Sequence, residues 1–461
     1  MRRTLRLTLI SIALIGTTGF SVYWGQTLGG ASRHGNPNLT LSSLAPLRAN
    51  RANNLAQDPN PSVSPEQVFQ ETLEKIQKEF VEGTGTDARL TEGALTRMLA
   101  SLDDPKTFYL SPTLRKIMQN AAMGHFQGIG AIICVTKRQT PQADLRQIEV
   151  VAVLPGSPAE KSGLQTHDII LSINDRRINP GATSIESDRA SREKTTEENV
   201  SLEPNDLHLQ NPVQKKRRPL STTHAIALLM TKNDAHLKLT VQRTNSPSPI
   251  EMQLQTVDLE LKPVEFQVLP GQVGYLRVRQ FNSISTKQFQ EALVQIGKLK
   301  KLIVDLRGNF GGVFSMAEPD LDAFASARKL LSALTKGGKV ALIERHPNLK
   351  APLVIQGSTA LTQIPMVVLI DGGCANLSEM TAAALRDSAG AKLIGSHTFG
   401  DNTLQLFHHL RSGGAIEVAT AHLFTEKGID LERGLEPDVI VLPNDGVKDS
   451  VLEIALQKLG G

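Results

Sequence analysis

The chain has 461 residues, of which 40% are hydrophobic, so it is long enough to fold as several domains with sizeable cores. Its formal net charge of +4 is the small difference between 50 basic and 46 acidic residues, and the two signs are interspersed along the chain. Because this composition produces no strong field of one sign, it excludes nucleic acid as the expected partner.

Cysteine and histidine are sparsely used. The two cysteines, Cys134 and Cys374, lie in different predicted domains, and the eleven histidines are scattered without metal-ligand spacing. We therefore expect no disulfide framework, no metal and no cofactor.

Residues 1–30 predict export. Three early arginines precede an apolar run from Leu7 to about Trp24, which is the pattern of a signal segment. Its length leaves two interpretations open, a cleaved signal peptide or a retained membrane anchor. Since positive charges before such a run stay in the cytoplasm, we expect the rest of the chain to be extracytoplasmic, in the periplasm or held at the inner membrane.

Residues 31–64 are rich in Asn, Pro, Ser and Ala without apolar periodicity, so we interpret them as a disordered tether. Helical periodicity starts near Pro65 in VFQETLEKIQKEFV and returns in TEGALTRMLASL, which ends at an Asp-Asp-Pro turn. Residues 65–125 are therefore predicted to form an N-terminal helical region.

Residues 126–262 alternate short strand-like runs, such as IEVVAVL, DIILSIN and LKLTVQR, with Gly and Pro turns around one helical stretch, THAIALLMTK. This pattern predicts a small β-rich domain. Residues 181–221 interrupt it with a polar segment dense in Glu, Lys, Ser and Asn. Such a segment cannot bury enough apolar surface to order itself, so we predict a disordered insertion.

Residues 263–461 have the pattern of a layered α/β domain. Strands in VGYLRVRQF, KLIVDLR, MVVLID and KLIGS alternate with helical stretches, and KDSVLEIALQKL predicts a closing amphipathic helix. The whole chain is therefore expected to have an α+β multidomain fold.

Four segments, taken in order, resemble the carboxyl-terminal processing (tail-specific) serine peptidase family. They are LTEGALTRMLASLDDPKTFYLS, FQGIGAII with the later SPAEKSGLQTHDIILSIND, LIVDLRGNFGGV, and MVVLIDGGCANLSEM with the later HTFGDNTLQ and RGLEPDVIV. The resemblance covers nearly everything after the tether. It implies a PDZ β-domain at residues 126–262 and a crotonase-like α/β peptidase domain at residues 263–461.

The resemblance implies that Gly128, Ile129 and Gly130 form the turn whose backbone N–H groups bind the terminal carboxylate of a polypeptide. The strand that begins at Ala131 would then pair with the polypeptide, and the THAIALLM helix would close an apolar pocket. His167 departs from the family, which commonly has Gly at this position.

The segment LIVDLRGNFGGV is similar to the family's Asp-Leu-Arg-Asn-Asn-Pro-Gly-Gly turn, which helps to bind the oxyanion of the tetrahedral intermediate. Gly311 and Gly312 are kept, whereas Phe310 replaces the proline. We therefore expect an oxyanion turn of altered shape.

The fourth segment aligns without gaps and places Asn376 at the family's nucleophilic serine and Asp401 at its general-base lysine. Asn lacks the hydroxyl of a serine nucleophile, and an anionic Asp would oppose the developing oxyanion. We therefore expect no intact catalytic residue, although Gln405 and Asp387 match supporting positions of the family. A further hypothesis is that the Asn376 amide donates a hydrogen bond to the Asp401 carboxylate.

A neighbouring side chain is an alternative nucleophile. Cys374, on the turn before the helix, is the better candidate, with Lys392 or His397 as candidate bases. Ser378 is expected to face away, because it lies two helical positions after Asn376.

Two function classes remain open. The first is an inactive homologue that binds the C-terminal tails of exported proteins, with an active relative as a candidate partner. The second is an active endopeptidase, serine-type or dependent on Cys374, that cleaves such tails. A third interpretation, a decaying paralogue without a binding role, has slight support from His167.

Overall fold

The computed structural model describes residues 63–81, 87–139, 144–179, 220–231, 236–312, 322–346, 349–358, 361, 364–442 and 449–460. The predicted signal or anchor segment, the tether up to residue 62 and most of the predicted insertion lie outside these residues. No helix within the described ranges is long and apolar enough to cross a membrane.

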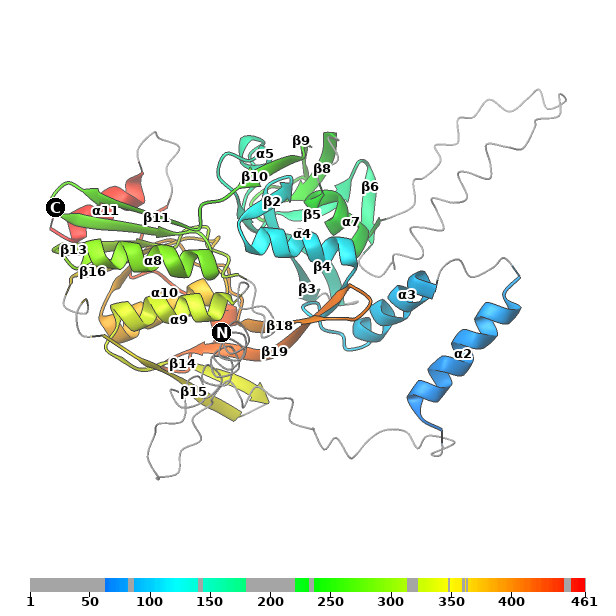
Figure 1. The fold of residues 1–461 in the computed structure, drawn as a ribbon. Coiled ribbons are helices and arrows are strands. Elements are labelled where there is room, and N and C mark those ends of the chain that lie inside the picture. Colours follow the sequence, from blue (N-terminus) through cyan, green and yellow to red (C-terminus); the bar gives the residue numbers. More distant parts are fainter. Residues whose placement is uncertain are drawn as a thin grey trace, which may run out of the picture.

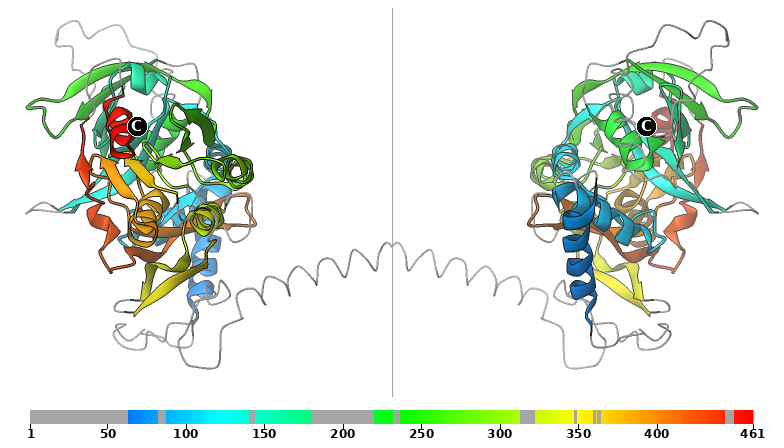
Figure 2. Two further views of the ribbon diagram at one scale, coloured as in Figure 1. Left: turned by 90° about the vertical axis from the view of Figure 1, so that its left-hand side faces the viewer. Right: turned by 90° about the vertical axis from the view of Figure 1, so that its right-hand side faces the viewer.

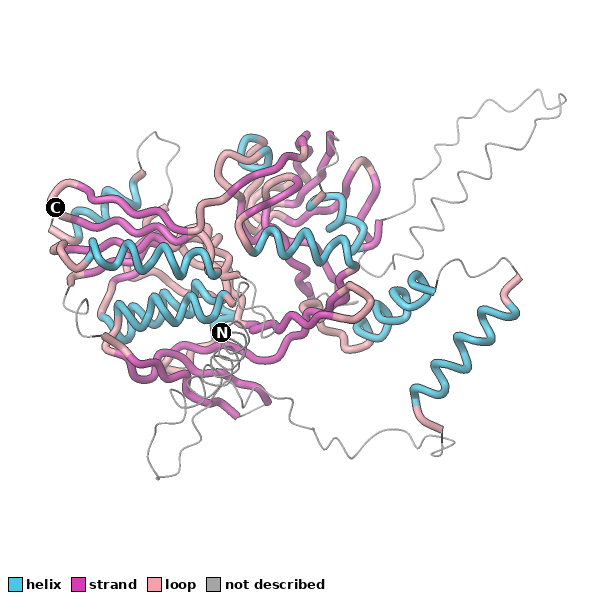
Figure 3. Tube along the Cα trace, viewed as in Figure 1, coloured by secondary structure: helices cyan, strands magenta, loops and turns pink. Residues whose placement is uncertain are grey.

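The β-rich region (126–262) and the α/β region (263–461) lie side by side, and a long hairpin of strands β18 (Thr403–His409) and β19 (Ala415–Thr425) reaches from the second toward the first (Figure 1). The tube trace in Figure 3 shows the same hairpin running between the two regions. Helix α2 (Pro65–Glu79) buries none of its residues and stands apart from both.

The α/β region is built on a six-stranded sheet in the order β11-β12-β13-β16-β17-β20. Strand β11 is antiparallel to β12, and the following strands are parallel. The strands are β11 (Val264–Leu269), β12 (Val273–Val278), β13 (Lys301–Asp305), β16 (Met366–Ile370), β17 (Lys392–Gly395) and β20 (Val439–Ile440).

Both faces of this sheet are covered. On one face Val304 and Val368 pack in the core formed with helices α8 (Ser283–Ile296), α9 (Ala323–Leu334) and α10 (Leu377–Ala389). On the other face Ile303 packs with α11 (Ser450–Lys458). Burial on both faces explains why KLIVD and MVVLI are nearly continuous apolar runs.

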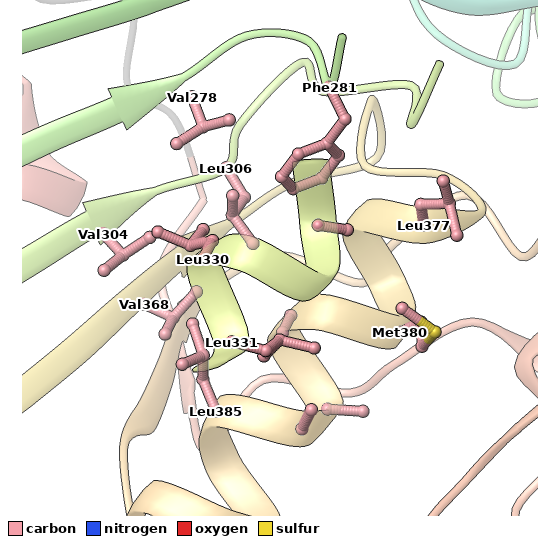
Figure 4. Close-up of a cluster of buried hydrophobic side chains, with 14 of the residues drawn as sticks. Val278, Phe281, Val304, Leu306, Leu330, Leu331, Val368, Leu377, Met380 and Leu385 are labelled. Atoms are coloured by element: carbon pink, nitrogen blue, oxygen red, sulfur yellow. The ribbon is translucent and has the colours of Figure 1, made fainter. Parts of the chain in front are cut away.

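A second sheet covers the far side of α9 and α10, whose side chains in Figure 4 include Leu330, Leu331, Leu377, Met380 and Leu385. Both views in Figure 2 keep α11 (red) and strands β14 and β15 (yellow) at opposite ends of the layered region. The sheet has the order β1-β19-β14-β15, with β18 also paired to β19. Its remaining strands are β1 (Phe108–Leu110), β14 (Gly337–His346) and β15 (Leu349–Gln356); the 3-10 helix η3 (Leu431–Arg433) follows β19.

Strand β1 belongs to the predicted N-terminal helical region, yet it pairs with β19 of the α/β region, with Phe108 opposite Glu417 and Leu110 opposite Ala415. The sequence analysis did not predict this strand. Helices α3 (Asp87–Ala100) and α4 (Pro112–Ala122) flank it, and the Ser111 side chain caps α4 by accepting from the backbone N–H of Leu114. The N-terminal region is therefore joined to the α/β region by backbone hydrogen bonds.

The β-rich region forms a seven-stranded sheet in which β3 lies at the edge and pairs, among the described strands, with β4. Strand β2 pairs separately with β10. The elements are β2 (His125–Gly128), β3 (Ala131–Gln139), β4 (Asp144–Val153), α5 (Pro158–Lys161), β5 (Ile169–Ile173), β6 (Arg176–Asn179), β7 (Leu220–Ser221), α7 (Thr222–Met230), β8 (His236–Gln242), β9 (Ile250–Gln255) and β10 (Val257–Glu260). The strands and the helix predicted from the sequence are all present.

A buried ion pair stabilises this region. Arg243 donates from Nε and Nη2 to the two carboxylate oxygens of Asp168, both at 2.8 Å, and Asp168 is fully buried. We expect Arg243→Ala to reduce the free energy of unfolding of the β-rich region by about 3 kcal/mol, because it leaves a buried carboxylate without its partner. Native-state hydrogen exchange of the β5 and β8 amides measures this change.

Lys238→Ala is the matched control, since Lys238 pairs with Asp175 and Glu251, whose side chains are both 64% exposed. We expect little change in exchange for this variant. Equal effects of the two substitutions would contradict a special contribution from the buried pair.

Candidate functional site

A cleft of about 530 Å³ lies where the three regions meet. Its walls come from α3, β1 and α4, from β3 and α7, and from the turn after β13, the start of α10 and the hairpin of β18 and β19. Many of the lining side chains are apolar, and the polar ones include Asn376, Asp401, Thr403 and Gln405. The cleft thus contains both positions that the sequence analysis aligned with the catalytic dyad.

Asn376 occupies a strained turn between strand β16 and helix α10. Its φ of 54° and ψ of −117° are unusual for any residue other than glycine. Gly311 packs directly against it, because a Cβ on Gly311 would lie 3.2 Å from the Asn376 Cβ. A strand, a strained turn and a helix form the arrangement that presents a nucleophilic serine in many hydrolases. Here the turn presents an amide to the cleft.

The Asn376 side chain is fixed by the backbone opposite. Its Nδ2 donates to Thr403 O at 2.5 Å, and its backbone N–H donates to Glu379 Oε2 at 2.8 Å. Asp401 Oδ1 accepts from the Thr403 backbone N–H at 2.9 Å. The hypothesis of a direct Asn376–Asp401 hydrogen bond is therefore wrong: each side chain bonds to a different backbone group of Thr403.

Asp401 has a cationic partner from a distant part of the chain. Lys106 Nζ lies 2.5 Å from Asp401 Oδ1, and the exposed fractions of the two side chains are 19% and 16%. Burial lowers the pKa of Lys106, but attraction to Asp401 and its hydrogen bond outweigh this effect and leave the pKa raised. Lys106 is therefore held as an ammonium, which cannot act as a general base.

Two buried carboxyls adjoin this pair. Burial raises the pKa of Glu379 to about 7, against hydrogen bonds from Thr398 and from the backbone of Gly400 and Asp401. Burial also raises the pKa of Glu417 to about 7, opposed by Lys106 and assisted by Asp401. Lys106, Asp401, Glu379 and Glu417 thus form a charge cluster beside the cleft, in which the protonation of one carboxyl affects the others.

In the predicted oxyanion turn, one backbone N–H group is already hydrogen-bonded within the turn. The backbone N–H of Gly311 donates to Asn309 Oδ1 at 2.8 Å, so it is engaged within the turn. Gly312 lines the cleft, and its φ of 144° and the 2.5 Å separation between an added Cβ and Phe281 O require glycine there. Phe310, which replaces the family's proline, packs edge-to-face on Phe126 of the β-rich region at 6.2 Å.

The predicted carboxylate-binding turn also needs a correction. The backbone N–H of Ile129 donates to Leu229 O at 3.0 Å, and a Cβ on Gly128 would lie 2.0 Å from the same oxygen. The prediction that Ile129 offers its N–H to a carboxylate is therefore contradicted in this structure, because the end of α7 accepts that hydrogen. Gly130 and Ala131 line the cleft.

Comparisons with known proteins agree with this geometry. Residues 272–441 match peptidase family S41, and residues 149–203 match the PDZ domain. The chain is similar to proteins named carboxy-terminal processing proteases. Its predicted fold class is confirmed, with an S41 peptidase domain and a PDZ domain in a mixed helix and sheet structure.

The chain is 28% identical over 380 residues to the carboxy-terminal-processing protease of Bartonella bacilliformis, covering 81% of this chain and 74% of that protein. It is also 28% identical over 371 residues to the carboxyl-terminal-processing protease of Synechocystis, covering 79% and 74%. A solved structure of a photosystem II D1 C-terminal processing protease is similar in fold, with a TM-score of 0.58, 24% identity and coverage of 87% of this chain and 98% of that one.

Cys374 and Ser378, two candidates from the sequence, do not line the cleft. Cys374 is fully buried, its Sγ donates to Leu306 O at 2.9 Å, and burial raises the pKa of its thiol. Ser378 faces away as expected and donates to Asn309 O at 2.6 Å. A buried, bonded thiol of raised pKa is a poor nucleophile.

Of the other candidates, Gln405 lines the cleft, whereas Lys392, His397 and Asp387 do not. Lys392 is exposed on β17, and His397 Nε2 lies 3.7 Å from Glu436. Asp387 does not line the cleft; it pairs with Lys427 at 2.8 Å near the end of α10. Gln405 does line the cleft and donates from Nε2 to Lys106 O at 2.8 Å. The match of Asp387 to a supporting position therefore has no counterpart in the site.

Lys106 and Glu417 complete the charge cluster but were not predicted from the sequence. Lys106 directly follows the Asp-Asp-Pro turn, but nothing in the sequence pairs it with Asp401. A contact of His167 was not predicted either: its ring stacks on Phe399 with centroids 4.9 Å apart, and its Nδ1 lies 2.8 Å from Glu149 Oε1. His167 thus joins the PDZ and peptidase domains.

We expect Lys106→Met to destabilise the protein by about 3 kcal/mol, because it leaves Asp401 without its partner in the cleft. Asp401→Asn combined with Lys106→Met is expected to recover at least about 1 kcal/mol of this loss, since neither charge then remains. Hydrogen exchange of the β18 and β19 amides measures the four states of this double-mutant cycle.

Lys137→Met serves as the control, because Lys137 pairs with Asp103, whose side chain is 72% exposed. It should change exchange far less. If the destabilisation by Lys106→Met and by Asp401→Asn is additive in the double variant, the ion pair does not couple the segment before β1 to the segment before β18.

Proposed function

We propose that this protein is an exported PDZ-containing homologue of the C-terminal processing proteases that binds the C-terminal tails of exported polypeptides without cleaving them. The observation that carries the proposal is the pairing of Asn376 with Thr403 and of Asp401 with Lys106 at the two dyad positions. The relatives are named as processing proteases. Binding of polypeptide tails is the part of that activity that this cleft can still perform.

Hydrolysis by this site lacks both chemical requirements. The Asn376 amide nitrogen is a poor nucleophile, and its hydrogen bond to Thr403 O holds it as a donor. Asp401 cannot remove a proton with the strength of a desolvated lysine, and Lys106 is held as an ammonium. The buried Cys374 supplies no substitute, so no observation favours the peptidase alternative.

Binding of an extended polypeptide is supported by the open edge of β3. Among the described strands β3 pairs with β4 alone, so its other edge has backbone groups available to a further strand. Ile133 on β3 and Ile226 and Met230 on α7 line the cleft beside that edge. These apolar side chains suit an apolar C-terminal residue.

Export remains a proposal that rests on the arginine-led apolar segment at residues 1–30. An extracytoplasmic place, with the segment either cleaved or retained as an anchor, would give the cleft access to tails of exported proteins. An active relative as a partner is a further prediction of this function.

The first test measures binding of a fluorescent peptide with an apolar C-terminal residue by anisotropy. We expect the wild-type protein to bind the free acid and to bind the C-terminal amide more weakly, because the backbone at the start of β3, where Gly130 and Ala131 line the cleft, would receive the carboxylate in place of the engaged Ile129 N–H. Ile226→Asp should weaken binding about tenfold or more, since it places a charge in the apolar wall.

Val294→Asp is the control, because Val294 is a similar residue on α8 that is 69% exposed. It should leave binding unchanged. If the peptide does not bind, or the acid and the amide bind equally, the proposed function is wrong.

The second test measures cleavage of an unfolded protein with an apolar tail. We expect no cleavage by the wild type and measurable cleavage by Asn376→Ser with Asp401→Lys, because the turn at residue 376 already has the geometry of a nucleophile site. A triple variant adds Lys106→Met, since Lys106 would otherwise face a second ammonium.

Cys374→Ala is assayed beside these variants. Cleavage by the wild type that this substitution abolishes would show a cysteine peptidase and overturn the proposal. Cleavage by the wild type that survives it would show an active site that uses other residues, and would overturn the proposal equally.

A further inference from the structure

Around Glu417 the cleft has more acid than base: Arg97 and Arg146 also line the cleft, but neither is among the charged groups that act on this carboxyl. Asp401 and Glu417 both line the cleft, and the charged groups that act on Glu417 are Lys106, before β1, and Asp401, before β18. Lys106 is already paired with Asp401. One ammonium thus serves two carboxyls, which leaves the charge of Glu417 without a partner of its own.

Glu417 is buried but incompletely bonded. Only 7% of the residue is exposed, and its Oε2 has no hydrogen-bond partner among the described residues. Buried polar atoms are nearly always paired, because an unpaired one loses the hydrogen bonds it made to water. The Glu417 side chain therefore lacks a donor that something entering the cleft can supply.

Aromatic rings flank this carboxyl on its own sheet. Glu417 lies on the central strand β19, opposite Phe108 of β1 on one side and opposite Phe407 of β18 on the other. Directly opposite residues share a face of the sheet, so the rings neighbour the carboxyl, and Phe108 also lines the cleft. A carboxylate beside aromatic rings is a favourable environment for a lysine or arginine side chain.

We infer that Glu417, with Asp401 and Phe108, forms a subsite for a cationic side chain of the bound polypeptide, upstream of its C-terminal residue. This inference rests on the proposed function, in which the cleft holds a polypeptide tail. An anionic group fits less well, since it would meet both carboxyls while the ammonium of Lys106 is already engaged.

The position of the cationic residue within the bound tail follows from the pairing of the tail with the edge of β3. Gly130 and Ala131 line the cleft at the start of β3, and Cys134 lies close enough to Lys106 to affect its pKa. A tail paired along β3 with its C-terminus at Gly130 advances roughly 3.3 Å per residue. The cationic side chain is therefore expected roughly three to five residues before the C-terminal residue.

The subsite should depend on pH. Burial, assisted by Asp401 and opposed by Lys106, raises the pKa of Glu417 to about 7. The carboxyl is mostly neutral at pH 6 and mostly ionised at pH 8, and a cationic side chain favours the ionised form. Affinity for a basic tail should therefore rise as the pH rises through 7.

The experiment uses the full chain and a peptide series that ends in the same apolar residue. Each peptide has one substituted position, which is roughly three, four or five residues before the C-terminal residue. That position holds either lysine or norleucine, whose side chain is similar in length but uncharged. At pH 8 we expect lysine at one position to bind about tenfold more tightly than norleucine there, which corresponds to about 1.4 kcal/mol. At pH 6 this ratio should fall toward one.

Glu417→Gln should remove the lysine advantage at pH 8, whereas Glu291→Gln, an exposed acid on α8, should retain it. Circular dichroism and binding of the norleucine peptide check that Glu417→Gln is folded. If lysine and norleucine peptides bind equally at every position, the subsite is refuted while tail binding stands. A lysine advantage that persists in Glu417→Gln also refutes it, and failure of all peptides refutes both proposals.

Discussion

The ion pair of Lys106 and Asp401 is the interaction on which the arrangement of the site depends. A carboxylate with 16% of its side chain exposed needs a partner, and the nearest one comes from the segment that precedes β1. That segment also bonds through Lys106 O to Gln405 and through Thr107 Oγ1 to the Ala419 backbone N–H. Pairing the charge therefore brings the N-terminal region against the hairpin of β18 and β19.

The pair also reduces the repulsion between Asp401 and the other carboxyls near it. Aspartate at position 401 would repel the nearby Glu379 and Glu417, whose carboxyls are buried. Lys106 offsets part of this repulsion. The strained backbone at Asn376 costs roughly 1 kcal/mol or more, which the surrounding turn must offset.

The sequence predicted the elements well because each has a local pattern. Continuous apolar runs such as MVVLI mark strands buried on both faces, and the helical periodicity that starts near Pro65 marks α2. The motif spacing also placed Asn376 and Asp401 together in one cleft. These features depend on neighbours in sequence or on a pattern shared with a family.

The features that escaped prediction depend on contacts between regions. Strand β1 is too short to show periodicity, and the partner of Lys106 cannot be read from a single chain because charges are abundant along it. The engagement of the Ile129 N–H by Leu229 O requires knowledge of where α7 ends. Each of these interactions is specified by the packing of surfaces, which leaves no periodic signal.

The pairing of β1 with β19 has a consequence for how the chain folds. The hydrogen bond between Gln405 and Lys106 spans 299 residues, so the N-terminal region can complete its contacts only after almost the whole chain is available. The β-rich region has local strand pairs and can form earlier. During synthesis, β1 and the apolar side of α4 therefore stay unpaired until the hairpin is available. In this interval the chain is most exposed to aggregation and to degradation.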